Sequence, residues 1–403
     1  MANNATDEPK DSDQHIQVNS IQNQIYVERM PIEIYSTQDI FTYDIDNLYP
    51  QKALSISDRS WSLDTATKTL SDFIRGDGWE EESFNDLELN ERGLTGFGLL
   101  KLLADIKSKL GFAIHVNYNL EFSVSEINYI DFENLRVKTD DKLVWRKDWR
   151  KVWSDNDKEY DRFNPDPEVI REQIKEAGGI ENWNGQVLYW TGSKSIYPLA
   201  KFDSVLDDGQ YQAEQKLDSL NNVQNGFSVS GAWVYPKTLQ STPESKEVDA
   251  KIKNNATGGR NAGRIITMQI PMGVEKGTVG FFPFERANID NLYVNQNEGA
   301  FQAIFSNFRQ PLILNSISES GVFNQEQYND AVTFYNSITE LERKEVEKAL
   351  TKVFDNSIWE VGDLKIKPKP ILKVEENIEI VEPGAEEKKE IDDGTERSGN
   401  NTD

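Results

Sequence analysis

The chain has 403 residues, enough for two buried cores or for one core with extended elements. Its formal net charge of −25 disfavours a protein that binds nucleic acid through many lysine and arginine contacts to phosphates, and the absence of cysteine excludes disulfides, thiolate metal sites and cysteine nucleophiles. Only two histidines occur, His15 and His115, so histidine metal sites and Ser-His-Asp triads are close to excluded, and we expect structural roles for both.

Both ends of the chain are polar. Residues 1–24 have almost no apolar clustering, which predicts a disordered leader that is unlike a signal peptide. Residues 375–403 carry a run of carboxylates interrupted by Lys388 and Lys389, which predicts a disordered acidic tail. No segment approaches the ~20 consecutive apolar residues of a membrane-spanning helix, so we expect no contact with a membrane.

Residues 25–202 predict a mixed α/β domain. The stretch "LDTATKTLSDFI" places apolar residues on one helical face, and Gly76 and Gly78 end the helix. These apolar residues are Leu63, Ala66, Leu70, Phe73 and Ile74. The stretch "LTGFGLLKLLADIKSKLGF" predicts a second helix that ends at Gly111.

Strands follow these two helices. In "FAIHVNY", residues 112–118, apolar and polar side chains alternate, and "FSVSEINYIDFENLRV", residues 122–137, continues the pattern. The stretches "DKLVWRKDWRKVW" and "GQVLYWTG" complete a sheet rich in aromatic residues. We therefore expect a sheet backed by helices.

A long surface helix is predicted for residues 203–225, with Asp203 as its N-cap. Its apolar stripe is narrow and comprises Leu206, Ala213, Leu217, Leu220 and Val223. Asn225 and Gly226 join this helix directly to a strand, "FSVSGAWVYP". A short helix, "TPESKEVDAKIKNNATGG", and a strand, "RIITMQIP", complete a small α/β unit.

Two more helices follow. The first, "ANIDNLYVNQNEGAFQAIFSNF", carries apolar residues at helical spacing, and Pro311 ends it. After the polar segment 310–323, a longer helix begins at Asn324 as its cap, and "IWEVGDLKIKP" predicts a closing strand within residues 324–374. A helix that leads to a small remote unit and a second helix that returns from it form a stalk of two antiparallel helices.

No motif in the sequence supports a reaction. The glycine-rich "NATGGRNAGR" lacks the Gly-Lys-Ser/Thr ending of a phosphate loop and follows a helix, so we interpret it as a connection. The carboxylates around Trp79 would suit a glycosidase, but acids this common form such pairs by chance. The EF-hand spacing is absent. We expect no enzyme activity, no cofactor and no metal.

The sequence resembles the portal proteins of tailed bacteriophages from about Asp46 to Pro368. "DNLYPQ", "GDGW" and "YIDFENLRV" are similar to parts of a portal wing domain. The most specific stretch is "YPLAKFDSVLDDGQYQAEQKLDSLNNVQNGFSVSGAWVYP", in which a helix ends on Asn-Gly before a strand, followed later by the turn "GGRNAGR". "FRQPLIL" departs from the Val-Pro-Pro sequence of many relatives, and no helical crown follows the last helix.

The resemblance implies an α+β, portal-like fold without a crown. It assigns a wing to residues 25–202, a first stem helix to 203–225, a clip to 226–284 and a second stem helix to 285–309. A tunnel loop at 310–323 and a long wing helix with a closing strand at 324–374 complete it. The implied stem subunit contacts are Ala213, Leu217 and Leu220; the channel residues are Asn315, Ser316, Ser318, Glu319 and Ser320; the clip contacts are Lys237, Glu244, Lys246 and Glu247.

The function implied by the resemblance is a ring of twelve subunits at one capsid vertex. Double-stranded DNA would enter and leave through it without sequence-specific binding. The implied partners are the terminase large subunit, a head-tail adaptor and the major capsid or scaffolding protein, in the virion and, during assembly, in the host cytoplasm. The alternatives are an acidic carboxylate glycosidase or other monomeric hydrolase, and a non-portal virion scaffold. The mass of the native particle distinguishes a monomeric enzyme from a ring.

Overall fold

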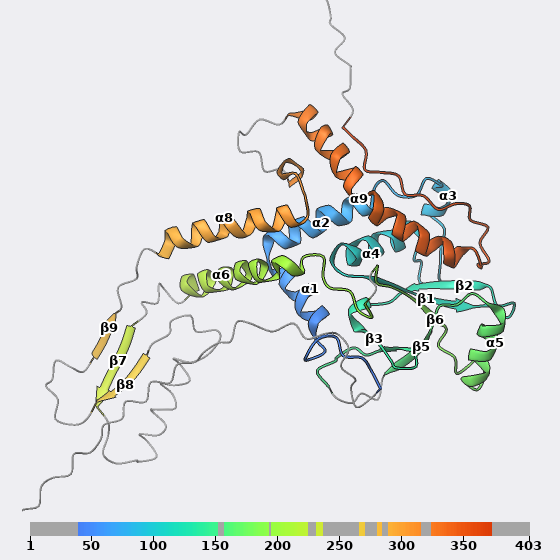
Figure 1. The fold of residues 1–403 in the computed structure, drawn as a ribbon, viewed down its shortest axis with the longest axis horizontal. Coiled ribbons are helices and arrows are strands. Elements are labelled where there is room, and N and C mark those ends of the chain that lie inside the picture. Colours follow the sequence, from blue (N-terminus) through green and yellow to red (C-terminus); the bar gives the residue numbers. More distant parts are fainter. Residues whose placement is uncertain are drawn as a thin grey trace, which may run out of the picture.

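The computed structural model describes residues 39–151, 157–192, 195–224, 231–236, 266–270, 280–283, 289–315 and 324–372. The fold is mixed α+β. A six-stranded sheet is backed by helices, and the two long helices α6 and α8 project from this body toward a separate three-stranded sheet (Figure 1). The predicted leader and tail lie outside the described residues.

The six-stranded sheet has the strand order β2-β1-β6-β5-β4-β3. All neighbouring pairs are antiparallel except β5 with β6, which is parallel. The strands are β1 (Phe112–Tyr118), β2 (Val124–Tyr129), β3 (Leu135–Val137), β4 (Leu143–Trp145), β5 (Lys158–Arg162) and β6 (Gln186–Trp190). The alternation predicted for residues 112–118 is confirmed, because its four larger apolar side chains are all buried.

Helices α1 (Tyr49–Arg59), α2 (Trp61–Arg75), α3 (Glu82–Asn85) and α4 (Gly96–Lys109) precede the sheet. The α2 helix forms where the apolar spacing predicts it, and its five predicted apolar residues are buried. Ser60 caps its start by accepting a hydrogen bond from the Leu63 amide. Gly76 ends it at φ +58°, a conformation that favours glycine.

Two strand predictions are wrong in extent. Residues 122–137 do not form one strand, because the 3₁₀ turn Phe132–Asn134 separates β2 from β3 and buries Phe132 against Tyr189, with ring centroids 4.8 Å apart. Of the stretch 141–153, the structure describes residues 141–151, and among these only β4 is a strand. Helix α5 (Pro167–Glu176) was not expected from the sequence, although Asp166 caps it and Pro167 opens it.

Helices α6 (Leu206–Gln224) and α8 (Ile289–Asn307) form the predicted antiparallel pair. Asp203 is not the N-cap: it opens a short 3₁₀ turn, Asp203–Val205, and accepts a hydrogen bond from the Tyr49 hydroxyl at 2.7 Å. The three-stranded sheet has the order β8-β7-β9, with β7 (Gly231–Pro236) parallel to β8 (Ile266–Ile270) and antiparallel to β9 (Gly280–Pro283). It lies beyond the far ends of both helices (Figure 1).

Helix α9 (Gln325–Phe354) is the longest helix described, and its predicted cap is confirmed: Asn324 accepts hydrogen bonds from the amides of Glu326 and Gln327. The predicted closing strand is not a strand. It is an extended segment with backbone contacts in two separate places: the Ile358 amide donates to the Val124 carbonyl at 3.0 Å, and Ile366 forms an isolated bridge with Trp79. Pro368 and Pro370 lack the amide hydrogens that a longer ladder needs.

Candidate assembly surfaces

The first half of α6 is anchored to the body by a buried glutamine. The Gln212 side chain, 2 % exposed, accepts a hydrogen bond from the Ser60 hydroxyl at 2.7 Å and donates one to the Ser62 hydroxyl at 2.9 Å. Both serines are buried at the corner between α1 and α2. Since these polar groups satisfy one another away from water, the contact fixes where α6 attaches.

Small residues bring α6 close to this corner. A side chain at Gly209 would collide with Leu63, a core residue of α2. Ala213 is also buried, at 6 % exposure. The close approach therefore depends on glycine at position 209.

Helix α8 is anchored beside α6. The Asn307 amide donates a hydrogen bond to the Lys201 carbonyl at 3.0 Å, and its oxygen accepts one from the Ser204 hydroxyl at 2.8 Å. Phe301 stacks on Trp61, with ring centroids 5.4 Å apart. The bases of both helices are therefore held by the same body, and the rest of the pair extends away from it (Figure 1).

The second half of α6 exposes the rest of its apolar stripe. Leu217 is 38 % exposed and Leu220 is 51 % exposed, whereas Ala213 packs inside its own chain. The three residues predicted as one contact surface thus divide into one intramolecular residue and two outward ones. Two exposed leucines on neighbouring turns are available to another surface.

The start of the predicted channel loop is fixed to α2. Helix α8 ends at Asn307, Arg309 follows at φ +50°, and a 3₁₀ turn, Leu312–Asn315, comes next. The Asn315 oxygen accepts hydrogen bonds from Gln310 at 2.6 Å and from Thr69 at 3.1 Å. The other four predicted channel residues lie outside the described residues, as do the four predicted clip contacts.

A cluster of ion pairs joins the base of the α6–α8 pair to α9. Lys107 of α4 pairs with Glu345 and, at 3.2 Å, with Glu342, and Lys201, just before α6, also pairs with Glu342. Burial alone would raise the pKa of Glu342, but Lys201 and Lys107 outweigh it and hold that pKa below its ordinary value. These residues line a pocket of about 380 Å³. We name this set, Lys107, Lys201, Glu342 and Glu345, the ionic junction.

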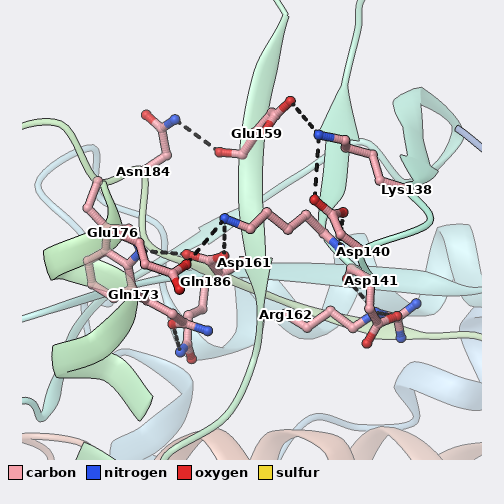
Figure 2. A network of polar contacts seen from close by, with 12 residues as sticks. Lys138, Asp140, Asp141, Glu159, Asp161, Arg162, Gln173, Glu176, Asn184 and Gln186 are labelled. Atoms are coloured by element: carbon pink, nitrogen blue, oxygen red, sulfur yellow. Dashed lines mark hydrogen bonds and ion pairs between the residues drawn. The ribbon is translucent and has the colours of Figure 1, made fainter. Parts of the chain in front are cut away.

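Figure 2 shows a second charged network, at the part of the sheet that contains β4 and β5 and next to helix α5. Each cation drawn and labelled there faces a carboxylate: Lys138 contacts Glu159 at 3.0 Å, and Arg162 contacts Asp141 at 2.8 Å. Lys142 pairs with Asp161 at 3.4 Å. Since these cations are already neutralised, this face does not form a basic surface for phosphates.

The candidates for chemistry have structural roles where they are described. Trp79 is fully buried and donates a hydrogen bond to the Gly96 carbonyl, so it cannot stack on a sugar. His115 lies 2.7 Å from the Asn184 carbonyl, and burial lowers its pKa, which keeps the ring neutral. Within the described ranges, no group of three or more candidate ligands could hold a metal, and no helix is long and apolar enough to span a membrane.

No sequence pattern indicates the anchoring contacts. Gln212 and Ser60 are 152 positions apart, and Lys201 and Glu342 are 141 positions apart, so no local spacing relates them. The sequence contains only an indirect sign of them: Gly209 and Gln212 interrupt the apolar side of α6. The role of such positions can be assigned only when the element that they face is known.

Comparisons with known proteins give structural likeness alone. No family model matches the chain, and no curated protein matches it. The solved structures with a similar fold include the virion of a native gene transfer agent particle, 14 % identical, with 80 % of this chain and 84 % of that chain covered at a TM-score of 0.47. The neck of the native particle, computed with C12 symmetry, is also 14 % identical, with 79 % and 84 % covered at 0.47. An HK97-family phage portal protein from Corynebacterium diphtheriae is 12 % identical, with 79 % and 95 % covered at 0.43.

Proposed function

We propose that this chain is the subunit of a portal-type ring at one vertex of a phage-like capsid, through which DNA is packaged and ejected. The observation that carries the proposal is the α6–α8 pair. Both helices are anchored at their bases by Gln212 and Asn307, and they lead to a separate three-stranded sheet. In this proposal the pair is the stem, the sheet belongs to the clip, and the six-stranded body with α9 is the wing.

The ring would close through the stem. Leu217 and Leu220 present an apolar strip that the described part of their own chain covers only partly, on a helix that otherwise carries mainly polar and acidic side chains. In a ring, each subunit uses two different faces, so a small strip on every copy can contact another surface on its neighbour. The resemblance implies twelve copies.

The charge of the chain supports a passage for DNA rather than a binding site. A formal charge of −25 repels phosphates, and the cations in Figure 2 are paired with carboxylates. Repulsion at every register leaves no deep energy minimum to stop sliding DNA. ATP hydrolysis would then belong to a separate terminase large subunit.

The remaining partners follow from the resemblance. The clip residues Lys237, Glu244, Lys246 and Glu247 are proposed to contact the terminase and later a head-tail adaptor. The wing is proposed to contact the major capsid or scaffolding protein. The protein would assemble in the host cytoplasm and remain in the virion.

The loop after Asn315 is proposed to line the channel, with Ser316, Ser318, Glu319 and Ser320 as its polar residues. Asn315 itself, bound to Thr69, would serve as the fixed base of that loop. Shortening the loop within 316–320 should leave rings intact and impair packaging or retention of DNA. Normal packaging by such a variant would contradict this role.

The decisive experiment measures the mass and shape of the purified native particle. A closed ring with an axial opening, seen by native mass spectrometry and electron microscopy, supports the proposal. A monomer would favour a hydrolase, and an assembly without an axial opening would favour a non-portal virion scaffold. The ring alone should not hydrolyse ATP, and any binding to duplex DNA should disappear as salt rises.

A further inference from the structure

The extended segment after α9 runs back along that helix in the opposite direction. The Ile366 amide donates to Glu347 at 2.8 Å, Lys369 bonds to Asn336, and Leu372 bonds to Asn329. The partners on α9 therefore move from its C-terminal half toward its first turns as the segment advances. The last described residue, Leu372, also accepts a hydrogen bond from Gln325, the first residue of α9.

Two asparagines bind the segment through its backbone alone. The Asn336 side chain donates to the Lys369 carbonyl at 2.9 Å and accepts from the Lys369 amide at 3.2 Å. The Asn329 side chain makes the same two bonds with Leu372, at 3.0 and 2.9 Å. A carboxamide carries one acceptor and two donors, so it can pair with both polar groups of one residue as a neighbouring strand would.

The spacing of the two asparagines matches the geometry of a polyproline II segment. Asn329 and Asn336 are seven residues apart, which is about 10 Å along an α-helix. Their partners, Lys369 and Leu372, are three residues apart, which is one polyproline II turn of about 9 Å. Pro368 and Pro370 flank Lys369 and favour that conformation. Asparagine is a weaker helix former than alanine, so its use at two matched positions in α9 indicates a role outside the helix.

The opposite edge of the segment is bound as well. The Lys367 amide donates to the Gly78 carbonyl at 2.8 Å, and its carbonyl accepts from the Asp77 amide at 3.0 Å. A side chain at Gly76 would collide with the Lys367 carbonyl. The side chains of Ile371 and Leu372 remain 52 % and 45 % exposed, so only about half of each is buried.

We propose that α9 carries a receptor surface for an extended, proline-containing segment, formed by Asn329 and Asn336, and that its occupant is residues 366–372 of the same chain. This surface determines where the acidic C-terminus begins. Residues 373–403, with eleven acidic and four basic side chains, are thereby tethered to the first turn of α9 instead of to its last turn. The inference does not depend on the portal function.

Hydrogen exchange measured by mass spectrometry on the full chain tests the proposal. Asn329→Ala with Asn336→Ala should raise the exchange rate of peptides covering 367–372 about tenfold or more, because two amides lose their acceptors. The control Asp330→Ala changes an exposed neighbour of similar helix propensity and should leave those peptides unchanged. Wild-type exchange in the double variant, or an equal rise in the control, would overturn the proposal. Lost protection of α9 itself in the single variants would also overturn it, since the asparagines would then support the helix.

A distance measurement provides a second readout. Because the chain has no cysteine, Gln327→Cys and Leu372→Cys can carry two spin labels without background. The distance distribution should be short and narrow with both asparagines present and should broaden in the double variant. A distribution that is broad from the outset, or that stays narrow without the asparagines, would contradict the tether.

Discussion

The two halves of α6 belong to one continuous helix but have opposite surroundings. In the first half, Gly209 and Gln212 face the corner between α1 and α2, and Ala213 beside them is buried as well. In the second half, Leu217 and Leu220 face outward. The first half of this helix therefore packs within the protomer, whereas its second half remains exposed.

The difference shows how to separate folding from assembly. Buried residues contribute to the free energy of unfolding of one chain, whereas exposed apolar residues contribute only when a second surface covers them. Mutations in the first half should therefore change the stability of the protomer. Mutations in the second half should change the mass of the particle and leave protomer stability nearly constant.

The largest expected effect is loss of the ring when both outward leucines are charged. Leu217→Asp with Leu220→Asp places two carboxylates in the proposed subunit contact, where desolvation of unpaired charge opposes association. Native mass spectrometry should find monomers. The free energy of unfolding of the protomer, measured by urea denaturation, should change by no more than about 0.5 kcal/mol, as for ordinary surface substitutions. The control Ser219→Asp adds a charge at an exposed position on the other side of α6 and should leave the ring intact. Rings of unchanged mass in the double variant would show that the stem is not the contact.

Ala213→Asp should act on folding instead. Ala213 is 6 % exposed, so an aspartate there buries a charge without a partner and should destabilise the protomer by about 3 kcal/mol or more. Chemical denaturation of the soluble fraction measures this change. If the variant folds with unchanged stability and fails only to assemble, then the division of α6 into two halves is wrong.

Gln212→Leu should have a smaller effect on folding. It leaves the buried Ser62 hydroxyl without its donor and removes the acceptor of Ser60, which should cost about 1–3 kcal/mol. Adding Ser62→Ala should recover part of that loss, because an apolar pair needs no hydrogen bond. The matched control Gln210→Leu makes the same substitution at an exposed position two residues before Gln212. It should not change the denaturation midpoint. Equal losses in both variants would mean that the buried pairs do not anchor α6.

Much of the fold was predictable because local rules agree with tertiary packing. Apolar spacing predicted α2 and its buried face, and Asn324 was recognised as the cap of α9. The strand alternation of residues 112–118 was equally clear. In each case the residues that determine the local conformation also face the core, so one pattern carries both signals.

The predictions failed where a distant residue decides the local conformation. Asp203 resembles a cap, but the Tyr49 hydroxyl holds its carboxylate inside a 3₁₀ turn. Residues 358–368 resemble a strand, but Ile366 forms only an isolated bridge with Trp79, and Pro368 has no amide hydrogen with which to extend a ladder. The division of the α6 stripe could not be predicted either, because α1 and α2 cover only its first half. Periodicity predicts a buried face but does not identify what buries it.

The smallest expected effect concerns the ionic junction, which joins the base of α6 to α9. The folded-state pKa of Glu342 is lowered, so its charged form stabilises the fold at pH above the unfolded-state value near 4.5, and this contribution is lost as the pH falls through the folded-state pKa. Glu342→Gln should therefore lower stability by about 1 kcal/mol at neutral pH, between the values for surface and buried pairs.

The pH dependence separates this ion pair from a general effect of charge. The difference between wild type and Glu342→Gln should shrink as the pH is lowered below 4.5, because both chains then carry a neutral side chain at position 342. The control Glu340→Gln removes a carboxylate from the exposed pair with Lys344 on the same helix and should produce no measurable change in the unfolding midpoint. A difference for Glu342→Gln that stays constant from neutral pH to below pH 4 would mean that side-chain shape, and not the charge of the ionic junction, stabilises the attachment of α6 to α9.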